Sequence, residues 1–500
     1  MARSVSVVIV GAGFGGVAAA IALKEQGVED IVLLERGDRV GGVWRANTYP
    51  GLACDVPSHL YSYSFAPNPR WSRRFSPRED IQRYVEDVAR RYDVMRHVRL
   101  GQEVMRAAFD DDEGRWHVET AAGEQHEADV LITACGQLQR ASIPDIPGLE
   151  RFRGPMFHSA HWDHDVDLTG KRVAVIGTGA SAIQFVPAIA PQVEHVTVFQ
   201  RSAPWVLFKL DRPYSERTQR LYERVPWLMR AWRRAWWLWM ESLVPLFTGR
   251  PKRTAQVVTP FYRALSNLQR FVQLRGNRSL MRATRPDYSM GCKRILTTFD
   301  WYPTLRRRNV DLVTERAGEV TEDAVVAANG RRFPADVIIF GTGFATTEFL
   351  APMEVEGRGG RRLADAWARG AEAYLGITVP EFPNMFLLYG PNTNHGVGSA
   401  LAMLEAEARY AADGVRALQS GAAERLEVRR DVHDRFQAEL SERLPDTVWT
   451  RCSSWYVTAE GRVTNNWPGS QREYMARTER LVLEDYVTGV PERVAEDSNR

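Results

Sequence analysis

Apolar residues near the start of the chain predict a strand, a turn and a helix. Residues 5–10 form a run rich in β-branched side chains that ends in the loop Gly11-Ala12-Gly13-Phe14-Gly15-Gly16, and an alanine-rich stretch, 17–24, follows. A second short apolar strand, 31–34, ends at Glu35. Because the first run leads directly into a glycine loop without a cleavage site, we interpret it as a buried strand and not as a signal peptide.

The same pattern returns in the middle of the chain. An apolar strand, 171–176, leads into Gly177-Thr178-Gly179-Ala180-Ser181-Ala182 and a helix, and the next strand, 196–199, is followed by Gln200-Arg201. Two further segments, 128–136 and 335–343, also resemble each other, each with an Ala-Asp-Val start and a glycine end. We interpret each of them as the strand that closes one nucleotide-binding half.

Between about 205 and 290 the strand pattern stops, which indicates a helical insertion. In it, a helix over 225–243 has an apolar face opposite Arg230, Arg233, Arg234 and Glu241. Packing inside the insertion or along a substrate tunnel is the favoured role of this face, and contact with a membrane surface is the alternative. The face consists of Val225, Leu228, Met229, Trp232, Trp236, Trp239, Met240 and Leu243.

Composition limits the class of protein. The 500 residues are 44% hydrophobic and 25% charged, with a net charge of +3 and no long basic run, so we expect a soluble protein of two or three domains that does not bind nucleic acid. The four cysteines lack CxxC or metal-ligand spacing, so we expect no disulfide, no metal site and a reducing, cytoplasmic location. The oligomeric state is left open.

The two glycine loops differ in the residue that follows the next strand. In the first, Gly11, Gly13 and Gly16 would let the pyrophosphate of a dinucleotide approach a helix N-terminus, and Glu35 would accept hydrogen bonds from the ribose of FAD or NAD. In the second, Arg201 and Ser202 take the place of the acid. A guanidinium binds a 2′-phosphate that a carboxylate would repel, so the second loop favours NADPH.

Two longer patterns resemble the type I flavin-dependent Baeyer-Villiger monooxygenases. FRGPMFHSAHWD, 152–163, fits the family pattern FxGxxxHxxxW(P/D), and residues 41–55 fit a second one that ends at Asp55. For His158, inside the first pattern, we favour a structural role. The resemblance implies an α/β fold of two Rossmann-like dinucleotide-binding domains, for FAD and NADPH, with a helical insertion.

The domain boundaries follow from these patterns. Residues 1–145 are the first part of the FAD-binding domain, and 150–204 and 293–380 are the two parts of the NADPH-binding domain. Residues 205–292 are the insertion, with the substrate pocket. Residues 381–500 return to the FAD-binding domain and end in a lid, for which the aromatic segment 452–456 is the candidate.

The resemblance also implies a reaction and its residues. NADPH reduces FAD, O2 forms a C4a-peroxyflavin, and attack on an apolar ketone gives an ester or lactone. Arg294 would stabilise the peroxide anion, Asp55 would orient Arg294, and Lys293 would bind the 2′-phosphate of NADPH. The other expected cofactor-binding residues are Phe14, Arg36, Gly42, Val43, Trp44, Tyr61, Val104, Gly136, Gly177, Thr178, Gly179, Ala180, Ser181, Gly341, Thr342, Gly343 and Asn392.

Two other enzyme classes remain open at this point. A flavin-containing monooxygenase that oxidises sulfur or nitrogen would use the same cofactors. An NADPH-dependent flavin reductase or oxidase would also need both nucleotide loops, although no redox-active CxxC pair is present for disulfide reduction.

Overall fold

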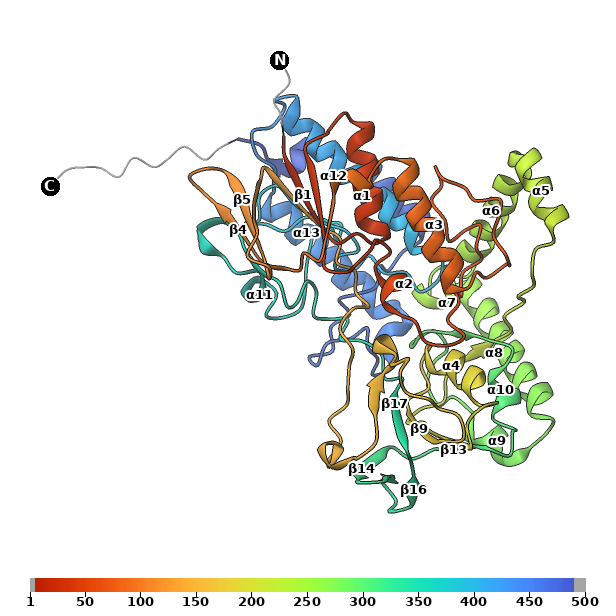
Figure 1. Ribbon diagram of the computed structural model, residues 1–500. Coiled ribbons are helices and arrows are strands. Elements are labelled where there is room, and N and C mark those ends of the chain that lie inside the picture. The colour runs from red at the N-terminus through yellow and green to blue at the C-terminus, as the bar shows by residue number, and fades with distance from the viewer. Residues whose placement is uncertain (1–4, 490–500) are drawn as a thin grey trace.

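The computed structural model describes residues 5–489, which form two α/β lobes with a group of helices along one side (Figure 1). The first lobe contains a five-stranded parallel sheet in the order β19-β7-β1-β2-β3. Its strands are β1 (Val7–Val10), β2 (Ile31–Glu35), β3 (Val98–Leu100), β7 (Val130–Thr133) and β19 (Met385–Leu387). Since β19 comes late in the sequence, the chain returns to this sheet after building the second lobe.

The second lobe repeats this topology. Its parallel sheet has the order β8-β17-β9-β10-β13, so the two similar segments of the sequence, in β7 and β17, occupy the same place in their sheets. Neither is an edge strand, because β19 and β8 lie beyond them. In sequence order, however, β7 is the last strand of residues 1–145 and β17 is the last strand of the second parallel sheet, so each closes its half as expected. The bounds are β8 (Met156–His158), β9 (Arg172–Ile176), β10 (His195–Phe199), β13 (Val310–Val313) and β17 (Val337–Phe340).

Helices cover the parallel sheets and bury their apolar faces. The first sheet packs with α1 (Phe14–Glu25), α3 (Arg78–Arg91) and α12 (Ala400–Gln419), and α4 (Ala182–Ile189) packs on the second sheet. Two small sheets are added at the periphery, a mixed one at the left of Figure 1 and an antiparallel one at the bottom. They comprise β4 (Val104–Asp110), β5 (Arg115–Thr120), β6 (Gln125–Ala128) and β18 (Glu354–Glu356), and β14 (Ala317–Thr321), β15 (Ala324–Ala327) and β16 (Arg332–Pro334).

The remaining elements are short, apart from α13 and the longer helices of the insertion. They are α2 (Val43–Ala46), α5 (Glu216–Arg224), α6 (Pro226–Glu241), α7 (Val244–Thr248), α8 (Lys252–Leu274), α9 (Arg278–Ala283), α10 (Trp301–Thr304), α11 (Leu363–Ala366), α13 (Arg430–Arg443), α14 (Gln471–Arg477), β11 (Val206–Leu207), β12 (Leu296–Thr297), β20 (Glu427–Val428) and β21 (Tyr486–Val487).

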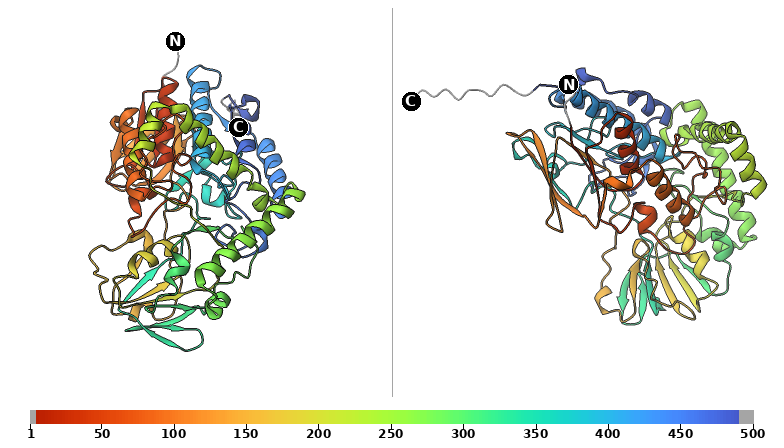
Figure 2. Two further views of the ribbon diagram at one scale, coloured as in Figure 1. Left: turned by 90° about the vertical axis from the view of Figure 1, so that its right-hand side faces the viewer. Right: turned by 45° about the horizontal axis from the view of Figure 1, so that its top comes forward.

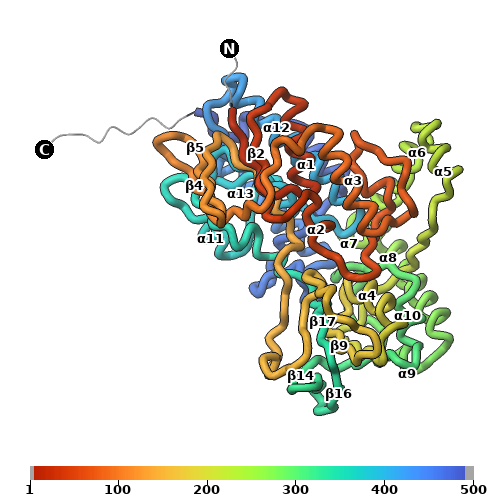
Figure 3. The backbone as a smooth tube through the Cα atoms, viewed as in Figure 1, coloured from red at the N-terminus to blue at the C-terminus, as the bar shows by residue number. Residues whose placement is uncertain are grey.

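Two segments of the chain run side by side between the lobes, as the tube in Figure 3 lets the reader follow. Ala141 and Phe344 form an isolated antiparallel bridge. The Ser142 amide donates to the Gly343 carbonyl at 2.9 Å, and the Ala345 amide donates to the Arg140 carbonyl at 3.0 Å. The connection between the lobes is thus hydrogen-bonded and not a pair of independent linkers.

The predicted helix over 225–243 is present as α6, but one of its polar residues is not on a solvent face. Arg233 donates to the carbonyls of His59 and Ser62, both at 2.8 Å, in the first lobe. Periodicity separates apolar from polar positions, but it does not reveal that a neighbouring turn supplies carbonyls to a guanidinium. In residues 5–489 no helix combines the length and the hydropathy that crossing a membrane requires.

The expectation that the cysteines form no disulfide was also wrong. Cys292 and Cys452 are bonded to each other across a sequence separation of 160 residues, and Cys54 and Cys135 are free. Local spacing could not indicate this pair, because the fold alone brings the end of the insertion to the C-terminal segment.

Candidate active site

A single cavity of about 1120 Å³ lies between the lobes and brings most of the predicted residues together. It contains both glycine loops, both strand-end residues and the Lys293-Arg294 pair. The predicted residues that line it are Gly11, Gly13, Phe14, Glu35, Arg36, Gly42, Val43, Trp44, Asp55, Tyr61, Val104, Gly136, Gly177, Thr178, Gly179, Ala180, Ser181, Arg201, Ser202, Lys293, Arg294, Gly341, Thr342 and Gly343.

The first glycine of each loop has a conformation and a contact that exclude a side chain. Gly11 has φ +100°, and a Cβ there would lie 2.7 Å from the Ala134 carbonyl oxygen. Gly177 has φ +106°, and its Cβ would lie 2.5 Å from the Gly341 oxygen. Both loops therefore pack against the end of the neighbouring strand and turn directly into a helix, α1 or α4, whose first amides face the cavity side.

The cavity also has free space where a cofactor would lie. Gly136 and Gly343 line it with φ +72° and +83°, and a Cβ at either would meet no protein atom within 4 Å. The helix that follows the first loop has no side-chain cap at Gly13, so its first amides are available to an anion. These features fit a dinucleotide at each loop.

Glu35 lies at the end of β2, where the dinucleotide pattern requires an acid. It is 5% exposed, and its two carboxylate oxygens accept from the Ala12 amide at 2.8 Å and the Gly37 amide at 2.7 Å. These bonds fix the carboxylate beside the glycine loop, and its remaining lone pairs suit ribose hydroxyls.

Three polar residues form the corresponding corner of the second lobe. Lys293 Nζ donates to Ser202 Oγ at 2.9 Å, and Arg201 precedes Ser202 at the end of β10. Burial, and then the nearby Arg201 charge, lower the pKa of Lys293. Arg201 and Lys293 both line the cavity, and two neighbouring cations suit an anion; a 2′-phosphate has the required charge and oxygens.

Arg294 and Asp55 connect the two halves of the cavity. Nη2 and Nε of Arg294 both donate to Asp55 Oδ2, at 2.7 and 3.1 Å. Their side chains are 39% and 26% exposed, and both line the cavity. Asp55 raises the pKa of Arg294. Burial alone would raise the pKa of Asp55, but the charge and the hydrogen bonds of Arg294 outweigh burial, so the pKa of Asp55 is lowered. The guanidinium is therefore fixed and stays charged.

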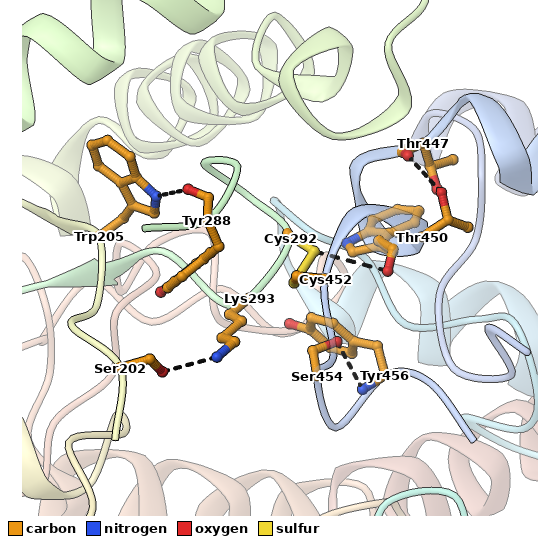
Figure 4. Close-up of a disulfide and its surroundings, with 11 residues drawn as sticks. Ser202, Trp205, Tyr288, Cys292, Lys293, Thr447, Thr450, Cys452, Ser454 and Tyr456 are labelled. Carbon is orange, nitrogen blue, oxygen red and sulfur yellow. Dashed lines mark hydrogen bonds between the residues drawn. A yellow bond between two sulfur atoms is a disulfide. The ribbon is translucent and has the colours of Figure 1, made fainter. Parts of the chain in front are cut away.

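The C-terminal segment 452–456, the predicted lid, contributes residues to the same cavity as this pair. Ser453, Ser454 and Trp455 line the cavity, and the rings of Trp455 and Tyr456 contact each other at a tilt of 33°, with centroids 4.2 Å apart. Figure 4 shows Lys293 between Ser202 on one side and the segment of Ser454 and Tyr456 on the other, with the Cys292–Cys452 disulfide beside them. The disulfide thus joins this segment to the residue before Lys293.

Tyr389 and Tyr456 are tyrosines whose pKa responds to the Arg294 charge, and sequence reasoning missed Tyr389. Tyr389 lines the cavity, and its hydroxyl donates to Asn394 Oδ1 at 2.6 Å. Burial raises the pKa of Tyr456 to about 12 even though the Arg294 charge lowers it, so both phenols stay neutral at working pH. The only signal for Tyr389 was its place just before the loop Gly390-Pro391-Asn392.

Two predicted residues have other roles. Gly16 lies inside α1, where a Cβ would be 1.9 Å from the Gly11 oxygen, so it serves the packing of the loop. Asn392 is turned away from the cavity: its side-chain amide donates to the carbonyls of Val463 and Asn466, both at 3.1 Å. Asn392 does not line the cavity, so the structure gives its side chain no place in the predicted cofactor site, and its cofactor-binding role stays a prediction.

His158 has the structural role that we favoured. It is 2% exposed at the end of β8, and its Nδ1 accepts from the Ala160 amide at 3.1 Å. Burial lowers its pKa to about 4, so the ring is neutral at physiological pH. It therefore has no charge to contribute to the cavity.

The insertion contributes less to the cavity than predicted. Within residues 5–489, Tyr288 is the one residue of 205–292 that lines it. The pocket is made mainly by the two lobes and the C-terminal segment, because several long apolar side chains of the insertion face outward.

Comparison with known proteins places the chain in a family. Residues 4–225 match a family model described as flavin-binding monooxygenase-like. Baeyer-Villiger monooxygenases from Streptomyces coelicolor and Pseudomonas aeruginosa are 43% and 40% identical, over 96% and 97% of this chain and 92% of each relative. A steroid monooxygenase bound to NADP has TM-score 0.83 and 32% identity, with 95% of this chain and 97% of that chain covered. A closed form of cyclohexanone monooxygenase has TM-score 0.83 and 27% identity, with 96% and 97% covered. The chain belongs to the Baeyer-Villiger monooxygenase family.

Proposed function

We propose that this enzyme uses FAD, NADPH and O2 to insert one oxygen atom next to the carbonyl group of an apolar ketone, giving an ester or lactone and water. The observation that carries the proposal is the Arg294–Asp55 ion pair in a cavity that also contains both glycine loops. A reductase would need the loops but not a fixed cation between them.

The two cofactors are assigned by the residues at the two strand ends. FAD lies in the first lobe, on residues 1–145 and 381–500, with Glu35 at its ribose. NADPH lies in the second lobe, on 150–204 and 293–380, with Arg201, Ser202 and Lys293 at its 2′-phosphate. The support is chemical: a buried carboxylate suits hydroxyl groups, and paired cations suit a phosphate.

The residues of this chain provide a positive charge, fix its orientation and keep water away from the reacting groups. When bound and reduced by NADPH, FAD supplies activated oxygen. Asp55 holds the guanidinium of Arg294 in one orientation, so that its free N–H groups stabilise negative charge on the ketone oxygen as it is attacked. Trp455 lines the cavity together with Arg294, and as part of the lid it would exclude water during the reaction, which would strengthen that interaction.

The direct test is aerobic incubation of the FAD-loaded enzyme with NADPH and a panel of cyclic, aryl and long-chain ketones, with sulfides and amines as competitors. Mass spectrometry should find esters or lactones with one added oxygen, and more NADPH should be consumed when ketone is present. Oxidation of sulfides alone would indicate a heteroatom monooxygenase. Release of one hydrogen peroxide per NADPH with every ketone would indicate an oxidase.

For the location we propose the cytoplasm, where NADPH is regenerated. The Cys292–Cys452 disulfide has to persist there, and Cys292 is fully buried, which limits access of cellular thiols to its sulfur. Alkylation of freshly lysed cells without a reductant tests this: two of the four cysteines should resist labelling after unfolding.

A further inference from the structure

The long helix α8 of the insertion has its polar side inside and its apolar side outside. Its buried face includes Ser266, Gln269 and Gln273, whose side chains donate to the carbonyls of residues 206, 298 and 299 at 2.8 to 2.9 Å. Polar side chains thus attach the helix to the protein, which is the reverse of an ordinary surface helix.

The outward face of α8 is a continuous apolar stripe. Its members follow one another at intervals of four, seven, three and one residues, which places them on one side of the helix, and they are 54% to 71% exposed. They are Val257, Phe261, Leu268, Phe271 and Val272. We call these five residues the α8 stripe. An apolar patch of this kind is unfavourable in water when it stays exposed in the monomer. We therefore expect another surface to cover it.

The neighbouring helix α6 adds to this surface. Trp227 and Trp239 are 64% and 44% exposed, and Trp239 contacts the Tyr262 hydroxyl of α8. Both helices lie along the side of the molecule that faces the viewer in the left view of Figure 2. Tryptophan is the side chain that prefers the boundary between lipid and water.

The charge of the insertion selects the kind of partner. Residues 205–292 have 17 Lys and Arg against five Asp and Glu, a net charge of +12, whereas the whole chain has +3. The rest of the chain is therefore at −9, and helix α8 itself has no acidic residue. Among the exposed cations of the insertion for which residues 5–489 show no ion pair with a carboxylate are Arg230, Arg234, Arg253, Arg263, Arg275 and Arg278.

We propose that the α8 stripe and the tryptophans of α6 dock on an anionic lipid surface, with the surrounding arginines against the headgroups. Apolar side chains between exposed cations are what such a surface binds. A symmetric contact with a second copy would set this basic face against itself, so charge disfavours it. Docking would not need a helix that crosses the bilayer.

The test is sedimentation of the full-length, FAD-loaded protein with vesicles. One set contains phosphatidylglycerol and phosphatidylcholine, and the other contains phosphatidylcholine alone. We expect binding to the anionic set, weakened by salt, and little binding to the neutral set. Phe261→Ser/Phe271→Ser and Arg253→Glu/Arg278→Glu should each weaken binding by at least about tenfold.

Matched controls change the same residue types elsewhere. Leu100→Ser/Val482→Ser removes exposed apolar side chains, and Arg91→Glu/Arg480→Glu reverses exposed charges, and both should bind as the unchanged protein does. Circular dichroism and bound FAD show that each variant is folded. Vesicle binding needs no turnover, so its outcome is independent of the ketone assay.

Three results would overturn the proposal. The first is a protein that stays in solution with anionic vesicles at low salt. The second is binding that neither Phe261→Ser/Phe271→Ser nor Arg253→Glu/Arg278→Glu weakens. The third is a concentration-dependent dimer that Phe261→Ser/Phe271→Ser abolishes without vesicle binding, which would assign the face to a second copy.

Discussion

Replacement of Glu407 by glutamine should remove a pH-dependent part of the stability of the first lobe. Glu407 is 0% exposed on α12, and its Oε2 accepts from the Tyr389 amide at 2.7 Å. The Tyr474 hydroxyl lies 2.7 Å from the Leu375 carbonyl and 3.1 Å from Glu407 Oε1. Because the single hydroxyl proton cannot serve both acceptors, the arrangement is complete when the carboxyl itself carries a proton.

The magnitude follows from the pKa. Burial raises the pKa of Glu407 from 4.5 to about 7, so in this interval the folded state binds the proton that the unfolded state has released. The contribution to stability is complete below pH 4.5 and is lost as the pH rises through 7. At about 1.4 kcal/mol per tenfold change in proton affinity, the loss is about 3 kcal/mol.

Urea unfolding on both sides of neutral pH measures this contribution. Glu407→Gln places an NH2 group where the protonated carboxyl is, so the variant does not lose this contribution as the pH rises. The difference in free energy of unfolding, variant minus unchanged protein, should therefore be larger above pH 7 than at acid pH by about 3 kcal/mol. Glu424→Gln, at an exposed site, should show no such difference. Equal pH profiles for the Glu407→Gln variant and the unchanged protein would refute the reasoning.

Two further predictions concern the cofactor corner and the disulfide. Arg201→Gln should lower the preference for NADPH over NADH by roughly 10- to 100-fold in kcat/KM, because a charge-assisted hydrogen bond contributes about 1.5–3 kcal/mol. The control, Arg36→Gln at the other loop, should leave the preference unchanged. An unchanged preference with Arg201→Gln would contradict the assignment. Cys452→Ser should lower the free energy of unfolding by about 2–4 kcal/mol, because it opens a closed loop between residues 160 apart. The control is Cys135→Ser, at a free cysteine. Equal stability of the two variants would count against a formed disulfide.

The sequence could predict the parts of the fold that depend on local patterns. The glycine loops, the strand ends at Glu35 and Arg201 and the helix over 225–243 are local, and the structure has each element where it was expected. The Arg294–Asp55 contact, between residues 239 apart, was expected only from the family resemblance, and the structure forms it.

Features that depend on distant contacts could not be predicted in the same way. The Cys292–Cys452 bond, the turn of Asn392 away from the cavity and the outward face of α8 all depend on which element lies next to which. Hydrophobic periodicity gives a helix an apolar side, but it does not say whether that side faces the protein. In α8 the buried side is the polar one, which reverses the usual inference.

The most direct test of the central claim is the ketone-oxidising activity of Arg294→Ala. Ester formation should fall by roughly 100- to 1000-fold, as expected when a donor to developing negative charge is removed. NADPH should still reduce the FAD of this variant, which is measured as the loss of flavin absorbance in the absence of oxygen. Arg172→Ala, which breaks the Arg172–Asp336 pair of 2.6 Å away from the cavity, is the matched control and should keep ester formation. Ester formation by Arg294→Ala at the rate of the unchanged enzyme would contradict the account.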